Sequence, residues 1–399
     1  MMLELNFYPL DIFCIALIAL LALVLPSQAI SDRFAGVLKS SRDWLPLITG
    51  LFLVNYAAVV IYYINSPAIV DHGEIMVPAA SWMFQSGHPL YTNMDDAARY
   101  STIYGPVGHV FYAWAMGLLG PTIFACKIAS GLAGLGSCLL AYLTFSKSFS
   151  RWIAWMATGL TAIYFLVFPI HTYLLKHDPF VIFFTALALW ACTSLKARPA
   201  QILLAIATGM LVNLKPHSFL YTMPLLALHY QRAGLKSVIG ASVGAVGVAV
   251  LPYLSKNISF WNWVAIMHSE AGAGFVGLNV LANTQWFAFL GVAFVALCYL
   301  LARNKPAALS VLLSANKWYL LSLGFSLFCV AVISSRNGSG PGHFVPLFQL
   351  VLYACCLIVE QLNTVAEEYV IDKEVSGVVS CCSAYCSCFD SFNEVIDRY

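Results

Sequence analysis

The residues of this chain best suited to chemistry are two carboxylates, Asp71 and Glu74, in the segment VDHGE at 70–74. They follow an apolar run over 44–64 that is long enough to cross a bilayer. Carboxylates at the mouth of a membrane span are costly to desolvate, so they indicate a site for protons, a metal or a polar substrate. His72 lies between them, and Tyr91 and Tyr104 follow in the same polar loop.

The elements that position these residues are predicted to be membrane helices. The chain has 399 residues, of which 61% are hydrophobic and 10% are charged, whereas soluble domains carry about 25% charged residues. This composition predicts a polytopic membrane protein, and a net charge of +2 gives no case for nucleic-acid binding. The apolar stretches lie at 10–26, 44–64, 105–119, 122–145, 152–169, 178–195, 200–214, 217–230, 237–254, 286–302, 318–334 and 344–360.

Basic residues predict the orientation of these stretches, because Lys and Arg gather on the cytoplasmic side. If 105–119 crossed the membrane, the alternation of charged and uncharged loops would fail for every later loop. If 105–119 lies on the outer surface, 14 of the 20 basic residues become cytoplasmic. We therefore predict an all-α bundle of about 11 spans, with the loop 65–121 wholly extracytoplasmic.

Further polar residues are predicted to gather on that same face. Asp178 precedes a proline and opens a span, so it either caps a helix or faces Asp71 as a second carboxylate. Lys176 and His177 come just before it. Lys215, followed by Pro216 and His217, either reaches the interface from a tight turn or supplies a cation for a phosphate.

A glycine-rich segment at 334–343 contains Arg336 and His343. It is either a flexible connector or a loop whose backbone amides approach an anion. No HExxH, GxSxG or Walker motif appears, so zinc protease, α/β-hydrolase and ATP-driven functions lack support.

The tail over 361–399 carries four cysteines, which are either reduced interfacial thiols, acylation sites or an irregular metal site. They are Cys381, Cys382, Cys386 and Cys388.

Taken in order, these residues resemble the GT-C superfamily of membrane glycosyltransferases. That group includes protein O-mannosyltransferases and the transferases that add aminoarabinose to lipid A. The resemblance covers residues 44–360 and rests on five features in order. They are the acidic pair Asp71 and Glu74, Gly87-His-Pro-Leu-Tyr91, Tyr104-Gly-Pro106 leading to Gly120, Asp178, and the basic segment Arg336 to Pro346.

The resemblance implies transfer of a sugar from a polyprenyl-phosphate donor to an acceptor hydroxyl on the extracytoplasmic or lumenal face, with inversion. The acceptor would be a glycan, a lipid or a protein. A carboxylate would act as general base. The two acids are separated by two positions where several members have them adjacent, so either could be that base, and we prefer Asp71.

The same resemblance implies roles for the other candidates. Cations and histidines would hold the leaving phosphate, and the two tyrosines would contact substrate. Asp178, His72 and His177 would position the acceptor or bind a divalent metal such as Mg²⁺ or Mn²⁺, since members of the group differ in metal use. The phosphate-binding candidates are Lys215, Arg336, Lys176, His217 and His343, and the substrate-binding candidates are Tyr91 and Tyr104.

A secondary transporter or a lipid flippase is the rival interpretation, because charges within the membrane also mark transport paths. Transporters often contain inverted repeats with broken helices in matching positions, and no internal repeat is evident. The long polar first loop also favours an enzyme. We therefore predict a catalytic membrane domain over 1–360, followed by a cytoplasmic tail.

Overall fold

The computed structural model describes residues 28–70, 73–96, 102–270, 274–337 and 339–368. Asp71, His72 and the four tail cysteines lie outside these described residues, as does the predicted first span at 10–26. Within the described ranges the chain is helical, and its only strand-like pairing is an isolated bridge between Phe275 and Arg336. The helices are α2 (Gln28–Asn65), α3 (Gly73–Gln85), α4 (Pro106–Leu119), α5 (Ile123–Ser148), α6 (Arg151–Val167), α7 (Pro169–Thr172), α8 (Asp178–Ser194), α9 (Ala197–Leu214), α10 (Phe219–Val250), α11 (Phe260–Glu270), α12 (Gly277–Asn304), α13 (Pro306–Ala315), α14 (Lys317–Ser334) and α15 (Phe348–Glu368), with 3₁₀ helices η1 (Pro216–Ser218), η2 (Leu251–Leu254) and η3 (Pro341–Leu347).

Seven of the described helical segments are long and apolar enough to cross a membrane, and three shorter apolar helices accompany them. The two spans predicted at 217–230 and 237–254 are joined into α10, which bends at Gly234. Gly234 has a φ of 77°, in the left-handed region that only glycine adopts readily. The predicted all-α polytopic fold is confirmed, while the count of 11 spans includes the segment 10–26 and stays a prediction.

Several elements differ from the ranges predicted from hydropathy, and α3 and α11 form where no apolar stretch was predicted. α2 begins at Gln28 rather than 44, because its first part is polar and hydropathy detects only the apolar part. α12 begins at Gly277, nine residues earlier than expected. α13 replaces an expected loop, and it starts with Pro306, whose missing N–H costs nothing at the first helical position.

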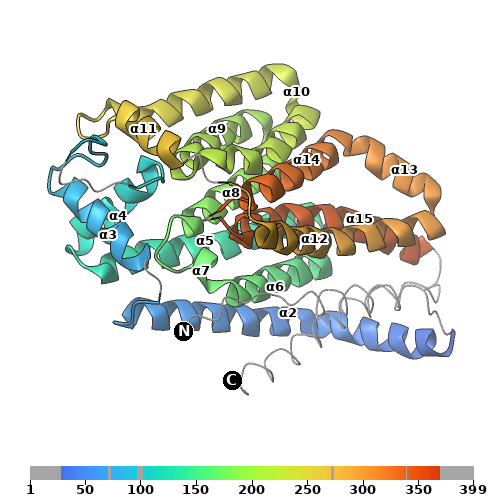
Figure 1. Ribbon diagram of the computed structural model, residues 1–399. Coiled ribbons are helices and arrows are strands. Elements are labelled where there is room, and N and C mark those ends of the chain that lie inside the picture. Colours follow the sequence, from blue (N-terminus) through green and yellow to red (C-terminus); the bar gives the residue numbers. More distant parts are fainter. Residues whose placement is uncertain (1–27, 71–72, 97–101, 271–273, 338, 369–399) are drawn as a thin grey trace.

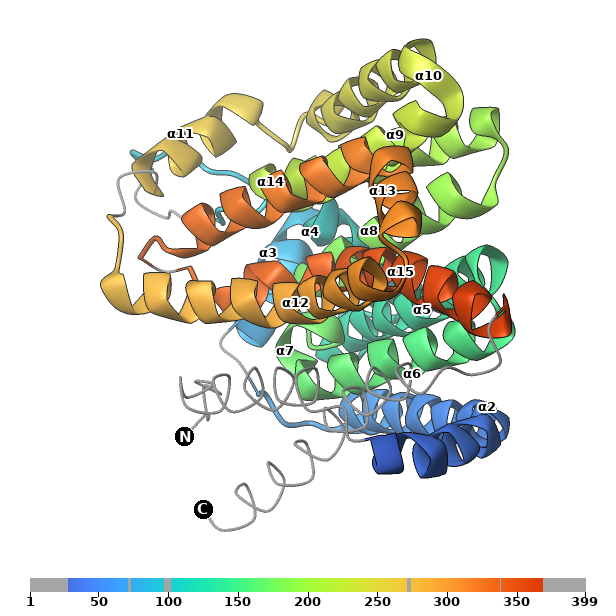
Figure 2. The same ribbon diagram turned by 90° about the vertical axis from the view of Figure 1, so that its right-hand side faces the viewer.

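The helices form one bundle in which α3, α4 and α11 lie at one end and α13 at the opposite end (Figures 1 and 2). Both ends of α4 are at the same end of the bundle. Before α4, the N–H of Gly105 donates to the carbonyl of Leu214 at the end of α9. After α4, Lys127 of α5 donates to the carbonyls of Ser66 and Ala68, which follow α2. This is the arrangement expected of a helix that lies along the membrane surface.

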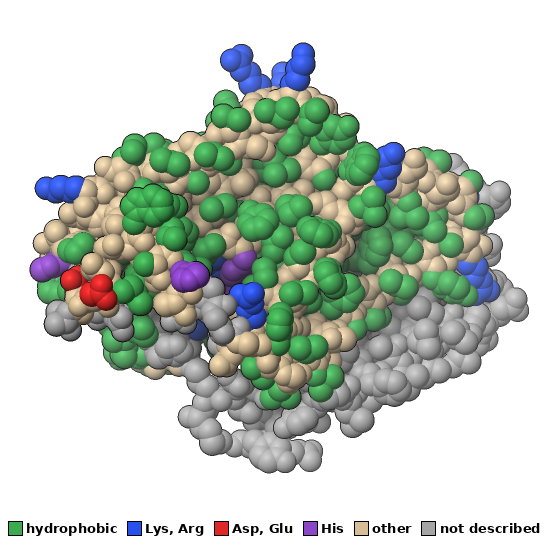
Figure 3. All heavy atoms as spheres, turned by 45° about the horizontal axis from the view of Figure 1, so that its top comes forward, with side chains coloured by type: hydrophobic (Ala, Val, Ile, Leu, Met, Phe, Trp, Pro, Cys, Tyr) green, Lys and Arg blue, Asp and Glu red, His purple; other side chains and the backbone are tan. Residues whose placement is uncertain are grey.

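The face of the bundle seen in Figure 3 carries many apolar side chains, as expected of helices in contact with lipid. Tyr62 and Val54 of α2, for example, are 77% and 67% exposed. Inside, small residues let helices approach closely, which is how helices associate in membranes. A Cβ added to Gly134 of α5 would lie 2.4 Å from the carbonyl oxygen of Thr172, so the backbone of α5 meets α7 directly at this glycine.

Candidate functional site

A buried ion pair between Lys215 and Asp178 lies at the end of the bundle that holds α4. Lys215 Nζ is 2.7 Å from Asp178 Oδ1, and the two residues are 7% and 6% exposed. Asp178 is the first residue of α8, and Lys215 is the residue between α9 and η1. Burial alone would lower the pKa of Lys215, but the nearby Asp178 carboxylate and Tyr104 outweigh it and raise that pKa above its usual value. The lysine is therefore charged.

Three histidines from separate elements surround this pair. His171 Nδ1, from α7, lies 3.6 Å from Asp178 Oδ1. The rings of His217 in η1 and His343 in η3 are 4.6 Å apart. We call these five residues, Asp178, Lys215, His171, His217 and His343, the lysine–histidine cluster.

Two features of the cluster bear on ligand binding. His217 Nε2 is buried without a hydrogen-bond partner among the described residues, and buried polar atoms are normally satisfied. Gly342 is what allows η3 to approach, because a Cβ there would lie 2.1 Å from the His171 ring. Part of the glycine-rich segment 334–343 is therefore fixed against the cluster.

A second group of rings covers the other side of Lys215. Its Nζ lies 5.4 Å from the centroid of Tyr104, and that ring stacks on His177 at 4.4 Å. His177 in turn meets His109 of α4 at 4.7 Å. Burial, with the proximity of His109 and Lys215, holds the pKa of His177 well below its usual value, so His177 is neutral. Gly108 makes room for this ring, since a Cβ there would lie 2.0 Å from His177 Cδ2.

Glu74 is completely buried, and both of its oxygens accept hydrogen bonds. The Tyr63 hydroxyl donates to Oε1 at 2.5 Å, and the Val70 N–H donates to Oε2 at 2.7 Å. Tyr63 also accepts from the N–H of Leu175 at 2.9 Å. Glu74 therefore fastens the residue before Asp71 to the segment that leads to Asp178.

Lys127 holds the same loop from the other side, and sequence reasoning did not assign it a role. Its Nζ donates to the carbonyls of Ser66 and Ala68 at 2.9 and 2.8 Å, and it lies 4.4 Å from the centroid of the Tyr63 ring. The available signal was a lysine inside an apolar span, which is rare unless it is partnered or functional.

The remaining candidates lie outside the cluster. Tyr91 is fully buried, and its hydroxyl donates to the carbonyl of Tyr104 at 2.8 Å. Lys176 is half-buried, and its carbonyl accepts from the Tyr112 hydroxyl. Arg336 is exposed, and its backbone pairs with Phe275. No described contact brings these three side chains to the Lys215–Asp178 pair.

Metal binding by the described side chains finds no support in their arrangement. No group of three or more His, Cys, Asp or Glu residues among them is placed to hold a metal ion. The histidines that line the cluster are spread around a lysine, whose charge disfavours a bound cation.

No protein-family model and no curated protein sequence matches this chain. Two solved structures do, both of ArnT from Cupriavidus metallidurans. With ArnT bound to undecaprenyl phosphate, the TM-score is 0.52 at 15% identity over 78% of this chain. With ArnT in the apo state, the TM-score is 0.51 at 15% identity over 83% of this chain. The chain spans 60% and 63% of the length of those two structures. The resemblance found in the sequence is thus confirmed as a likeness of fold, and the chain has the GT-C fold of ArnT.

Proposed function

We propose that this protein is a membrane glycosyltransferase that takes a sugar from a polyprenyl-phosphate donor and transfers it to an acceptor hydroxyl. The observation that carries the proposal is the lysine–histidine cluster. It combines a buried cation with the imidazole of His217, whose Nε2 has no partner among the described residues, at the bundle end that also holds the acidic loop. The fold supports the proposal, because it is shared with an ArnT structure that binds undecaprenyl phosphate.

The cluster suits the phosphate of the donor. Lys215 has three N–H donors, and one of them is committed to Asp178. The others, with the unpartnered Nε2 of His217, can donate to phosphate oxygens. Because the charge of Asp178 already neutralises that of Lys215, hydrogen bonds to the phosphate oxygens would provide most of the binding. Arg336, on the glycine-rich segment, would add net positive charge to this end of the bundle.

Asp71 is the better candidate for the general base. Glu74 is buried and its two oxygens are occupied by Tyr63 and Val70, so it is poorly placed to reach an acceptor. In the proposed step, Asp71 takes the proton of the acceptor hydroxyl and the acceptor oxygen bonds to the anomeric carbon. The bond from that carbon to the phosphate oxygen breaks, and polyprenyl phosphate leaves with its electron pair.

The bundle end with the cluster would face the outside of the cell or an organelle lumen. This side follows from the charge distribution, in which 14 of 20 basic residues become cytoplasmic if the acidic loop is outside. Tyr104, whose ring faces Lys215, would contact the donor.

A direct test is incubation of the purified protein with a panel of labelled polyprenyl-phosphate sugars, together with glycan, lipid and protein acceptors, and detection of released polyprenyl phosphate. We expect release with at least one donor, and a drop of about 10²–10⁴-fold in turnover for Asp71→Asn with donor binding retained. Absence of both turnover and binding for every donor would contradict the proposal. Normal turnover in Asp71→Asn would remove Asp71 from the mechanism.

A further inference from the structure

The helices α2 and α6 separate at the end of the bundle that lies away from the lysine–histidine cluster. They touch at Thr49, whose hydroxyl donates to the carbonyl of Trp155 at 2.8 Å. One turn further along α6, a Cβ added to Gly159 would lie 2.8 Å from Thr49 Oγ1. Beyond this contact, toward the start of α6, the two helices enclose a cavity of about 350 Å³.

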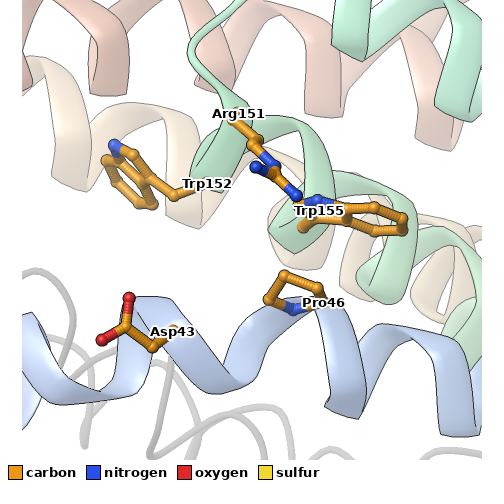
Figure 4. A pocket seen from close by; sticks show the side chains of 5 residues that line it. All are labelled: Asp43, Pro46, Arg151, Trp152 and Trp155. Atoms are coloured by element: carbon orange, nitrogen blue, oxygen red, sulfur yellow. The ribbon is translucent and has the colours of Figure 1, made fainter.

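The cavity is lined by one acid, one base, two indoles and a proline (Figure 4). Asp43 and Pro46 come from α2, and Arg151, Trp152 and Trp155 come from α6. The side chains of Asp43 and Arg151 stand on different sides of the opening (Figure 4). Among the described residues, neither has an ion-pair partner.

The cavity lies at a membrane boundary. Arg151 is the first residue of α6, and the 17 residues of that helix span about 25 Å. His171 and the rest of the lysine–histidine cluster follow the far end of the same helix. A distance of about 25 Å is close to the hydrocarbon thickness of a bilayer, about 30 Å. Tryptophans are enriched where lipid headgroups begin, and Trp44 is exposed beside this cavity as well.

We propose that this cavity binds the headgroup of a zwitterionic phospholipid that carries a primary amine. Arg151 would bind the phosphate and Asp43 would accept hydrogen bonds from the ammonium group. Trp152 and Trp155 add indole rings to the lining, and such rings attract ammonium groups. The acyl chains would lie against the exposed apolar side chains of α2, such as Leu47 and Leu51.

The charges of the cavity select this class of headgroup. A purely anionic headgroup would meet the carboxylate of Asp43, which repels it. A choline headgroup carries the positive charge but has no N–H to donate to Asp43. A primary ammonium beside a phosphate satisfies the acid and the base together. The proposal is independent of glycosyl transfer, because it concerns the opposite end of the bundle.

The test uses the purified full chain in detergent, with phosphatidylethanolamine, phosphatidylcholine or phosphatidylglycerol added. Bound lipid is counted by native mass spectrometry, and the midpoint of thermal unfolding is measured in parallel. We expect phosphatidylethanolamine to be retained best and to raise the midpoint most. Asp43→Asn should abolish its preference over phosphatidylglycerol, and Arg151→Gln should weaken retention of every phospholipid by about tenfold.

Matched controls remove a charge of the same sign from an exposed position elsewhere. Asp95→Asn and Arg198→Gln serve this purpose, since both residues are exposed and away from the cavity. These controls should bind lipid like the unmodified chain. Equal retention of all three lipids, preference for phosphatidylglycerol, or identical behaviour of cavity variants and controls would each overturn the proposal.

Discussion

The hydroxyl of Tyr63 joins Glu74 to Leu175, because it donates to the Glu74 carboxylate and accepts from the Leu175 N–H. Through this one hydroxyl, the acidic loop is fixed to the segment that ends at Asp178. Glu74 therefore acts as an anchor of the loop, and a substitution there should disturb the structure as well as turnover.

The first prediction concerns this anchor. Glu74→Gln keeps the shape but turns one acceptor oxygen into an NH₂ group, which cannot accept a hydrogen bond. Either the Tyr63 hydroxyl or the Val70 N–H then loses its acceptor. Leaving a buried donor unsatisfied costs about 1–3 kcal/mol, so the thermal midpoint of the purified protein should fall. Tyr63→Phe, which removes the shared hydroxyl, should lower it in the same way.

Asp71→Asn is the matched comparison, because it changes the neighbouring carboxylate without breaking these bonds. It should keep the midpoint of the unmodified protein and lose turnover. If Glu74→Gln were as stable as the unmodified protein and still inactive, the carboxylate of Glu74 would have a chemical role that its burial argues against.

The second prediction concerns the buried pair of Lys215 and Asp178. Lys215→Met leaves the Asp178 carboxylate buried without its partner, which costs about 3–5 kcal/mol. The double variant Lys215→Met/Asp178→Asn removes both charges and should recover much of that stability. Thermal unfolding of the two variants in detergent measures the difference.

Donor binding separates the structural role of this pair from the proposed one. If Lys215 donates to the donor phosphate, the double variant should be stable and still bind polyprenyl phosphate at least tenfold more weakly, since charge-assisted hydrogen bonds contribute about 1.5–3 kcal/mol. Arg336→Ala, on an exposed loop, should weaken binding without loss of stability. Unchanged affinity in a stable double variant would show that the pair only holds α8 against α9.

Sequence reasoning identified the members of this site better than their arrangement. Asp178 and Lys215 were both singled out, one at a helix start and one at a turn. Their pairing across 37 positions depends on how α8 and α9 pack, and no local pattern encodes that.

Hydropathy located most of the membrane spans, because the bilayer imposes a minimum apolar length. It could not show that α2 extends back to Gln28, since a polar helix outside the membrane has no such signature.

The hydrogen bonds of Glu74 could not be predicted from the sequence for a related reason. An acid near a span has the same sequence signature whether it acts on a substrate or anchors a loop. Only its neighbours distinguish the two, and these come from α2 and from the loop before α8. Lys127 was set aside as a single lysine within a span, although its partners Ser66 and Ala68 explain its burial.

The third prediction concerns topology. Single cysteines placed at Asp95 and Leu118, both exposed, should react with a membrane-impermeant thiol reagent added from outside intact cells or sealed lumenal-side-out vesicles. The reason is that α4 begins and ends at the bundle end that holds the acidic loop. A cysteine at Arg198 should react only after the membrane is opened. Labelling of position 118 only from the cytoplasmic side would contradict the proposed orientation of α4.

The last prediction concerns pH and follows from His109, which is 1% exposed in α4. Its Nδ1 lies 3.1 Å from the Ser81 hydroxyl. Since that hydroxyl donates to the Val77 carbonyl, Nδ1 carries the proton of the neutral ring, and Nε2 has no partner among the described residues. Burial lowers the pKa of His109 from 6.5 to about 4.

Between pH 6.5 and about pH 4, His109 binds a proton in the unfolded chain but not in the folded chain. The stability that His109 contributes is therefore present above pH 6.5 and is lost as the pH falls toward 4, by roughly 3 kcal/mol at most. His109→Asn should show a shallower fall of the thermal midpoint between pH 7 and pH 5 than the unmodified protein. His88→Asn, at an exposed histidine, is the control, and its thermal midpoint should fall with pH as steeply as that of the unmodified protein. If the midpoints of the unmodified protein and both variants fell equally with pH, His109 would be already charged in the folded state or not buried.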